Sequence, residues 1–190
     1  MSDRQTLNER MLCSVERSRS FETLLESKGA FGLQHFRKGK RGQYHLLTEM
    51  PFLNGVTDVG KTYMLNATFN GVTQSTGWYL GLIAGATTPT LSNSDTSLSH
   101  TGWSEFLSYT ESVRQTWTKT SASGNTVTGS ASSVFTIGTV VANTFVNGGF
   151  VISDSTKAGT SGILWSTGLF TNPVPVQPTD VFKLGYLTGL

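Results

Sequence analysis

The chain has 190 residues, of which 37% are hydrophobic and only 14% are charged; Gly, Ser, Thr and Asn supply the difference. This length suffices for one core domain with an appendage, and the hydroxyl-rich composition favours strands and turns. The single cysteine, Cys13, excludes an internal disulfide framework and a multi-cysteine metal site.

The charges are divided unevenly along the chain. Residues 1–42 hold nine Lys and Arg against five Asp and Glu, a net charge of +4, whereas residues 43–190 hold five against seven, a net charge of −2. Such a split is typical of an interaction tail. Residues 1–20 lack the apolar run of a signal peptide, and no apolar run approaches the roughly 20 residues that span a bilayer. We therefore expect synthesis in the cytoplasm and no membrane contact.

Residues 6–28 are expected to form one helix or two short ones. Three apolar residues recur at i, i+4 and i+8, on one helical face; the pattern loses phase at residues 18–20, and a second apolar cluster follows. Such a segment cannot bury its apolar face alone. It must pack on the body, pack on a neighbouring subunit, or remain frayed. We expect its apolar side chains to be anchors on a partner: Leu7, Met11, Val15, Phe21, Leu24 and Leu25.

Residues 29–42 are interpreted as a flexible linker. They contain four glycines and the basic run Arg37–Arg41. Two interpretations remain open: a solvated loop, or contact with an acidic surface or nucleic acid. No aromatic stacking ladder accompanies the charges, so a dedicated nucleic-acid site is not expected. The chain would thus divide into a basic arm, 1–42, and a body, 43–190, and removing the arm should leave the body folded.

The body is expected to be mainly β, an antiparallel β-sandwich or jelly roll. A strand is predicted at 43–47, and then a short helix near 58–69 that Asp58 caps. Alternating apolar and polar runs between turn signals predict nine further strands, at 78–83, 103–107, 114–120, 125–128, 133–137, 140–146, 149–153, 162–170 and 181–187. Asn147-Gly148 predicts a hairpin turn, and Pro173, Pro175 and Pro178 predict an extended loop or a sheet edge.

Candidate catalytic groups are few and isolated. No two of the histidines, 35, 45 and 100, have the i, i+4 spacing of a helical metal site. Glu105 and Glu111 are the nearest carboxylates, but nothing marks them as a glycosidase pair. The tryptophans, 78, 103, 117 and 165, all fall in predicted strands, where packing is favoured over an exposed sugar-binding platform.

One stretch, Gly55–Thr62, has the G-x-x-x-x-G-K-T spacing of a phosphate-binding loop. A real loop of this kind follows a buried parallel strand and opens a helix within a βαβ unit. Residues 49–54 are a poor strand, and no βαβ alternation follows. We interpret the match as chance, with a turn at Asn54-Gly55, and expect no enzyme activity, cofactor or metal.

Four stretches of the body carry a resemblance to a known family: Trp78–Ile83, Asp95–Glu105, Ser155–Trp165 and Phe182–Thr188. Together they resemble a recurrent family of small structural proteins of tailed-bacteriophage virions, over roughly residues 42–190. The resemblance implies a virion component without catalysis. It does not extend to the first 40 or so residues, which are particular to this chain.

Within that family we expect a capsid decoration (cement) protein on the outer surface of the phage head. Its partners would be the major capsid protein and further copies of itself, in a homo-oligomer such as a trimer. Arg37, Lys38, Lys40 and Arg41 would meet acidic capsid loops, while the apolar anchors become ordered along the capsid or a neighbouring copy. Two alternatives are a tail, collar or fibre-base protein, and a carbohydrate- or receptor-binding module.

Overall fold

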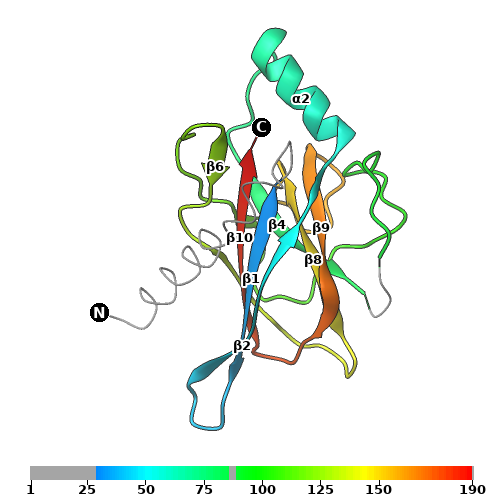
Figure 1. Cartoon of the computed structure of the whole chain (residues 1–190). Coiled ribbons are helices and arrows are strands. Elements are labelled where there is room, and N and C mark those ends of the chain that lie inside the picture. The colour runs from blue at the N-terminus through cyan, green and yellow to red at the C-terminus, as the bar shows by residue number, and fades with distance from the viewer. Residues whose placement is uncertain (1–28, 86–88, 190) are drawn as a thin grey trace.

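The computed structural model describes residues 29–85 and 89–189, which form two antiparallel β-sheets packed against each other (Figure 1). The predicted fold class, a mainly β antiparallel sandwich, is confirmed. The helix predicted at 6–28 and its six apolar anchors lie outside the described residues.

Sheet A has the strand order β2-β1-β10-β6, with β7 also paired to β10. Its strands are β1 (Ala30–Lys38), β2 (Tyr44–Leu53), β6 (Thr126–Thr128), β7 (Ser133–Thr136) and β10 (Val181–Gly189). Sheet B has the order β3-β9-β8-β4-β5. Its strands are β3 (Gly55–Val56), β4 (Tyr79–Ala84), β5 (Gln115–Thr116), β8 (Phe145–Ile152) and β9 (Leu164–Pro175).

The main core lies between the two sheets and is rich in aromatic rings. Phe31 of β1 stacks on Phe52 of β2 with ring centroids 4.9 Å apart, and it also lies 4.6 Å from the ring of Tyr186 on β10. Leu80 and Leu82 of β4 belong to the same buried cluster from the opposite sheet. Burial of these large side chains supplies most of the driving force for closing the sandwich.

The prediction of a flexible linker at 29–42 is wrong over most of this range. Ala30–Lys38 forms β1, which pairs with β2 on one side and with β10 on the other. Its first seven residues are buried, including Gln34 and His35. A strand buried on both faces shows no alternation, and these polar residues interrupt its apolar run. A body lacking residues 1–42 would lose this central strand, so we now expect that it would not fold alone.

The prediction of a hairpin turn at Asn147-Gly148 is wrong as well. β8 runs without a break through both residues, and the register of β8 against β9 shifts between Val146 and Gly148. A Cβ at Gly148 would lie 2.1 Å from the carbonyl oxygen of Gly168. The glycine therefore permits a close approach of β9 at an irregularity within the strand, the other common role of a strand glycine.

The proline-bearing segment continues β9, where Val174 pairs with Val146. β3 pairs with β9 only at Ser166 and Thr167. Pro173 and Pro175 thus lie where the described strands leave one side of β9 without a partner, which agrees with the predicted edge.

Several other predicted elements form as expected. The strands at 78–83, 125–128, 133–137 and 181–187 correspond to β4, β6, β7 and β10. The strand at 43–47 continues to Leu53, through the stretch predicted to be a poor strand. Residues 103–107 form no named strand, and only Glu105 makes an isolated bridge, to Ile83.

Helix α2 (Asp58–Phe69) forms where it was predicted, but its cap is Thr57 rather than Asp58. The Thr57 hydroxyl accepts a hydrogen bond from the amide of Gly60 at 3.1 Å and donates to the carbonyl of Leu164 on β9. The spacing that resembles a phosphate-binding loop is thus divided between β3, which is antiparallel to β9, and the first turn of α2.

Candidate functional site

The most prominent surface feature is a hairpin in which β1 and β2 extend beyond the rest of the sandwich (Figure 1). Its tip is closed by hydrogen bonds from Gly39 to Gln43 at 2.8 Å and from Gly42 to Gly39 at 2.9 Å. Lys38, Lys40 and Arg41 are all exposed at this tip. We call residues 37–47 the basic hairpin.

The basic hairpin also exposes apolar side chains on its second strand. Tyr44, Leu46 and Leu47 are 47%, 44% and 49% exposed, and leucine is a residue type that is often buried. Among the described strands, β2 pairs only with β1, so its outer edge is open. The hairpin therefore combines positive charge, apolar surface and a strand edge, a combination typical of interaction surfaces.

A buried carboxylate fixes the base of the basic hairpin. Asp180, just before β10, accepts two hydrogen bonds from Arg37, at 2.9 and 2.7 Å, and one at 2.9 Å from Nε2 of His35. The backbone amide of Gln177 donates a fourth, at 2.9 Å. The side chain of Asp180 is only 1% exposed. Arg37, predicted to contact a partner, is thus a bidentate partner of Asp180 and helps to hold the hairpin in place.

The environment shifts the pKa values of this cluster. Burial would raise the pKa of Asp180, but the hydrogen bonds from Arg37, Gln177 and His35 outweigh it and lower the pKa below its usual 3.8. Burial lowers the pKa of His35 below its usual 6.5, and the hydrogen bond to Asp180 only partly opposes this effect. Because Arg37 already balances the carboxylate, His35 can donate its hydrogen bond as a neutral ring.

We expect stability to fall as the pH drops below about 6.5, the ordinary pKa of histidine. The unfolded chain binds a proton on His35 before the folded chain does, so acid favours unfolding. The lowered pKa of Asp180 adds a loss of the same sign below 3.8. Urea midpoints measured from pH 7 to pH 5 should decrease, and His35→Gln should flatten this decrease. His45→Gln, on the exposed hairpin, is the control; an equal flattening there would contradict the assignment.

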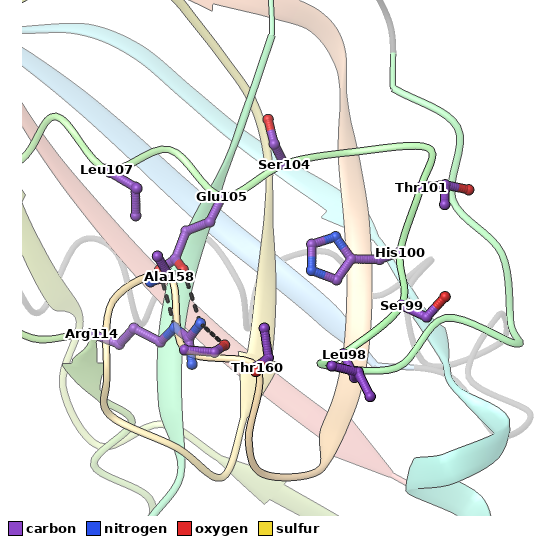
Figure 2. Close-up of a pocket in the computed structure, with 11 residues that line it drawn as sticks. Leu98, Ser99, His100, Thr101, Ser104, Glu105, Leu107, Arg114, Ala158 and Thr160 are labelled. Atoms are coloured by element: carbon purple, nitrogen blue, oxygen red, sulfur yellow. Dashed lines mark hydrogen bonds and ion pairs between the residues drawn. The ribbon is translucent and has the colours of Figure 1, made fainter.

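A second candidate is an open pocket of about 500 Å³ between two loops, lined by Leu98–Thr101, Ser104, Glu105, Leu107, Arg114 and Ala158–Thr160 (Figure 2). Arg114 donates to both carboxylate oxygens of Glu105, at 3.0 and 2.9 Å, and to the carbonyls of Asp154 and Gly159 at 3.0 Å each. The guanidinium is thus engaged in binding the two loops together.

The two carboxylates considered as a catalytic pair do not face each other across this pocket. Glu105 lines it, and besides Arg114 it accepts a hydrogen bond from the amide of Ala158 at 2.8 Å. Glu111 is not part of the lining, and both of its oxygens accept from the amide of Thr136 at 3.1 Å. Each carboxylate holds backbone in place, and the separated pair of a glycosidase is not formed by these two residues.

The loops that carried the family resemblance pack together beside this pocket. Ser97 donates to the carbonyl of Gly162 at 2.8 Å, linking the stretch 95–105 to the stretch 155–165. Trp103 donates to Asp95 at 2.9 Å, and the ring of His100 stacks on Trp103 with centroids 4.0 Å apart. His100 lies in the pocket (Figure 2). Residues 95–105 and 155–165 therefore form one loop layer at the side of sheet B.

The tryptophans serve mainly in packing. Trp103 and Trp117 are 8% and 5% exposed, and Trp78 and Trp165 are partly buried against the main core with ring centroids 6.0 Å apart. Only Trp165 lies in a strand, so the prediction that all four do is wrong. Trp103 and Trp117 are too deeply buried to form the open platform that stacking on a sugar requires.

Among the predicted partner-binding residues, the cations lie on the basic hairpin, and the six apolar anchors lie outside the described residues. Lys38, Lys40 and Arg41 gather at the hairpin tip, whereas the described chain begins at Gly29, at the other end of β1. The length of β1 separates these ends by roughly 26 Å. The basic run in the sequence identified the cations. No local pattern predicted Asp180 as their anchor, because Asp180 lies 143 residues from Arg37.

Within residues 29–85 and 89–189, no group of three or more His, Cys, Asp and Glu side chains is placed to hold a metal ion. In the same part of the chain, no helix combines the length and the hydropathy needed to cross a membrane. A scan against models of protein families finds no match to this chain, and a search of curated proteins finds none either.

Proposed function

We propose that the protein is a non-enzymatic structural component of a bacteriophage virion, and that it is a capsid decoration (cement) protein on the outer surface of the head. The observation that carries the proposal is the basic hairpin, a projecting and firmly anchored contact element on a β-sandwich. The resemblance of residues 42–190 to small virion proteins supports the choice of a phage particle as its partner.

The chemistry of the hairpin favours a protein surface as its target. Exposed Lys40 and Arg41 would meet acidic loops of the major capsid protein, while Leu46 and Leu47 would be covered at the centre of the contact. An apolar centre with a charged rim is the usual anatomy of a protein interface. Nucleic acid would offer its phosphates to the cations, but it would not offer an apolar surface that covers the two leucines. We therefore do not propose it as the partner.

The proposed mechanism is preferential binding to the assembled shell. A ligand that binds only the assembled form stabilises it by mass action. Many copies acting on subunits that already lie close together multiply this effect, even when each contact is weak. Self-association of the chain, for example as a trimer, would add contacts between neighbouring copies. Leu7, Met11 and Val15 of the N-terminal segment are proposed as a second contact, on the capsid or on a neighbouring copy.

Charge reversal at the hairpin tip is the direct test. The double variant Lys40→Glu with Arg41→Glu should bind purified heads that lack the protein at least tenfold more weakly, because attraction to acidic loops becomes repulsion. The matched control is Lys61→Glu with Lys119→Glu, which makes the same change in net charge at two exposed sites away from the hairpin. Sedimentation with heads measures both. Equal binding of the two double variants would rule out the basic hairpin as the contact.

Copy number separates the head from the tail. A decoration protein should appear on a stained gel of purified virions in an amount comparable to the major capsid protein. A tail, collar or fibre-base protein should appear at only a few to some dozens of copies. A receptor-binding module would adsorb to host cells as the purified protein.

A further inference from the structure

A groove at the end of the molecule opposite the basic hairpin lacks an assigned role. It has a volume of about 290 Å³ and is lined by Met64, Ala122, Gly124–Val127, Trp165, Thr188 and Gly189. Its walls are thus α2, the turn before β6, β6 itself, the start of β9, and the end of β10. Most of the exposed lining is apolar, which is the character of a surface that receives apolar side chains.

The helix beside the groove adds further uncovered apolar surface. Gly60 is the only residue of α2 that is fully buried, and a Cβ there would lie 2.8 Å from the carbonyl of Trp165, so the helix meets β9 closely at its first turn. Farther along, Leu65 and Phe69 are 52% and 77% exposed. They lie at i and i+4, on one helical face next to Met64. Two exposed apolar residues on one face of a short helix indicate a contact that the described residues do not supply.

The chain enters the sandwich next to this groove. A Cβ on Gly29 would lie 2.7 Å from the carbonyl of Leu187 and 2.5 Å from the hydroxyl of Tyr186. Leu187 immediately precedes the groove residues Thr188 and Gly189, and Trp165 donates to the hydroxyl of Tyr186 at 2.9 Å. Residues 1–28 therefore join the described structure within a residue or two of the groove wall.

We infer that this groove binds the chain's own segment 21–25, with Phe21, Leu24 and Leu25 as the seated side chains. Leu25 is four residues from Gly29, which places it about 6 Å away along a helix and at most about 14 Å away in an extended chain. A segment tethered so close has a high effective concentration at the groove. The apolar side chains of this segment would cover Met64, Trp165 and the exposed face of α2.

The assignment separates the two apolar clusters of the N-terminal segment. The cluster at residues 21–25 is seated on its own body, and the cluster formed by Leu7, Met11 and Val15 is left for another partner. The loss of helical phase at residues 18–20 divides the same two groups. This inference does not depend on the proposed function, because it concerns contacts within one chain.

Cysteine cross-linking in the full-length chain tests the inference. In a Cys13→Ser background, Glu22→Cys is combined with Ala122→Cys, an exposed groove position, so that the three seated side chains remain intact. Mild oxidation should give a disulfide within one chain, at a rate independent of protein concentration. Adding Leu24→Ser and Leu25→Ser should slow this reaction at least tenfold, because the seated side chains are then lost.

Each other outcome overturns the inference. An unchanged rate in the serine variant would show that the tether alone brings the cysteines together. A disulfide between two chains, seen as a dimer that forms faster at higher concentration, would show that the groove takes the segment of a neighbouring copy. No disulfide at all, with the wild-type circular dichroism spectrum retained, would show that the segment lies elsewhere.

Discussion

Replacing Arg114 with methionine is expected to lower the free energy of unfolding by about 3–5 kcal/mol, because it leaves the carboxylate of Glu105 buried without its partner. Both side chains are almost inaccessible, 3% and 7% exposed, and they share two hydrogen bonds. The change also removes donors to the carbonyls of Asp154 and Gly159. Urea unfolding followed by tryptophan fluorescence measures the loss.

Lys61→Met is the matched control, because Lys61 pairs with Asp58 at 3.4 Å but the two side chains are 49% and 65% exposed. Water screens such a pair, so its loss should cost less than about 1 kcal/mol. A double variant, Arg114→Met with Glu105→Gln, should recover part of the stability, since no buried charge then remains. If Arg114→Met costs no more than Lys61→Met, the ion pair does not hold the two loops together.

Replacing Asp180 with alanine is expected to cost about 3–5 kcal/mol and to loosen the basic hairpin. The substitution removes the acceptor shared by His35 and Arg37, and it leaves the His35 ring buried without its partner. Arg37 is 32% exposed and can turn to water, so the cost should lie near the lower end of the range. Hydrogen exchange should become faster at the amides of residues 38–47 than in the wild-type protein.

Asp58→Ala removes an exposed carboxylate from α2 and is the control for this change. It should leave both the hairpin amides and the unfolding midpoint close to those of the wild type. Equal exchange of the hairpin amides in the Asp180→Ala and wild-type chains would show that the sheet register alone fixes the hairpin. The position of the basic hairpin would then not depend on the buried carboxylate.

The sequence predicted the elements whose signals are local. Strands β4, β7 and β10 have one clear apolar pattern each, and α2 has a helical pattern of its own, so their positions follow from neighbouring residues. The antiparallel class followed from many short strands without long helices between them. These features depend on residues within a few positions of one another.

The misplaced elements depend on distant residues. β1 contains Gly32 and buried polar side chains, and the partners of these side chains are distant in sequence: Gln34 donates to Glu49 at 3.1 Å, and His35 donates to Asp180 at 2.9 Å. Gly148 follows an asparagine, so the local sequence predicts a turn. Its actual role is to permit the close approach of Gly168, which is distant in sequence. Lys38, Lys40 and Arg41 are exposed, whereas Arg37 binds Asp180; the run was interpreted as flexible because this anchor lies 143 residues away.

The pairing of β1 with β10 has a practical consequence. Ala30 lies opposite Leu187, so the start of the first strand and the end of the last are neighbours, and both are far from the hairpin tip (Figure 1). A peptide or enzyme fused after Gly189 would leave the molecule on the side away from Lys40 and Arg41. If the hairpin faces a capsid shell, as we propose, such cargo would point outward into solution. The fold would then suit multivalent display of antigens on an assembled particle.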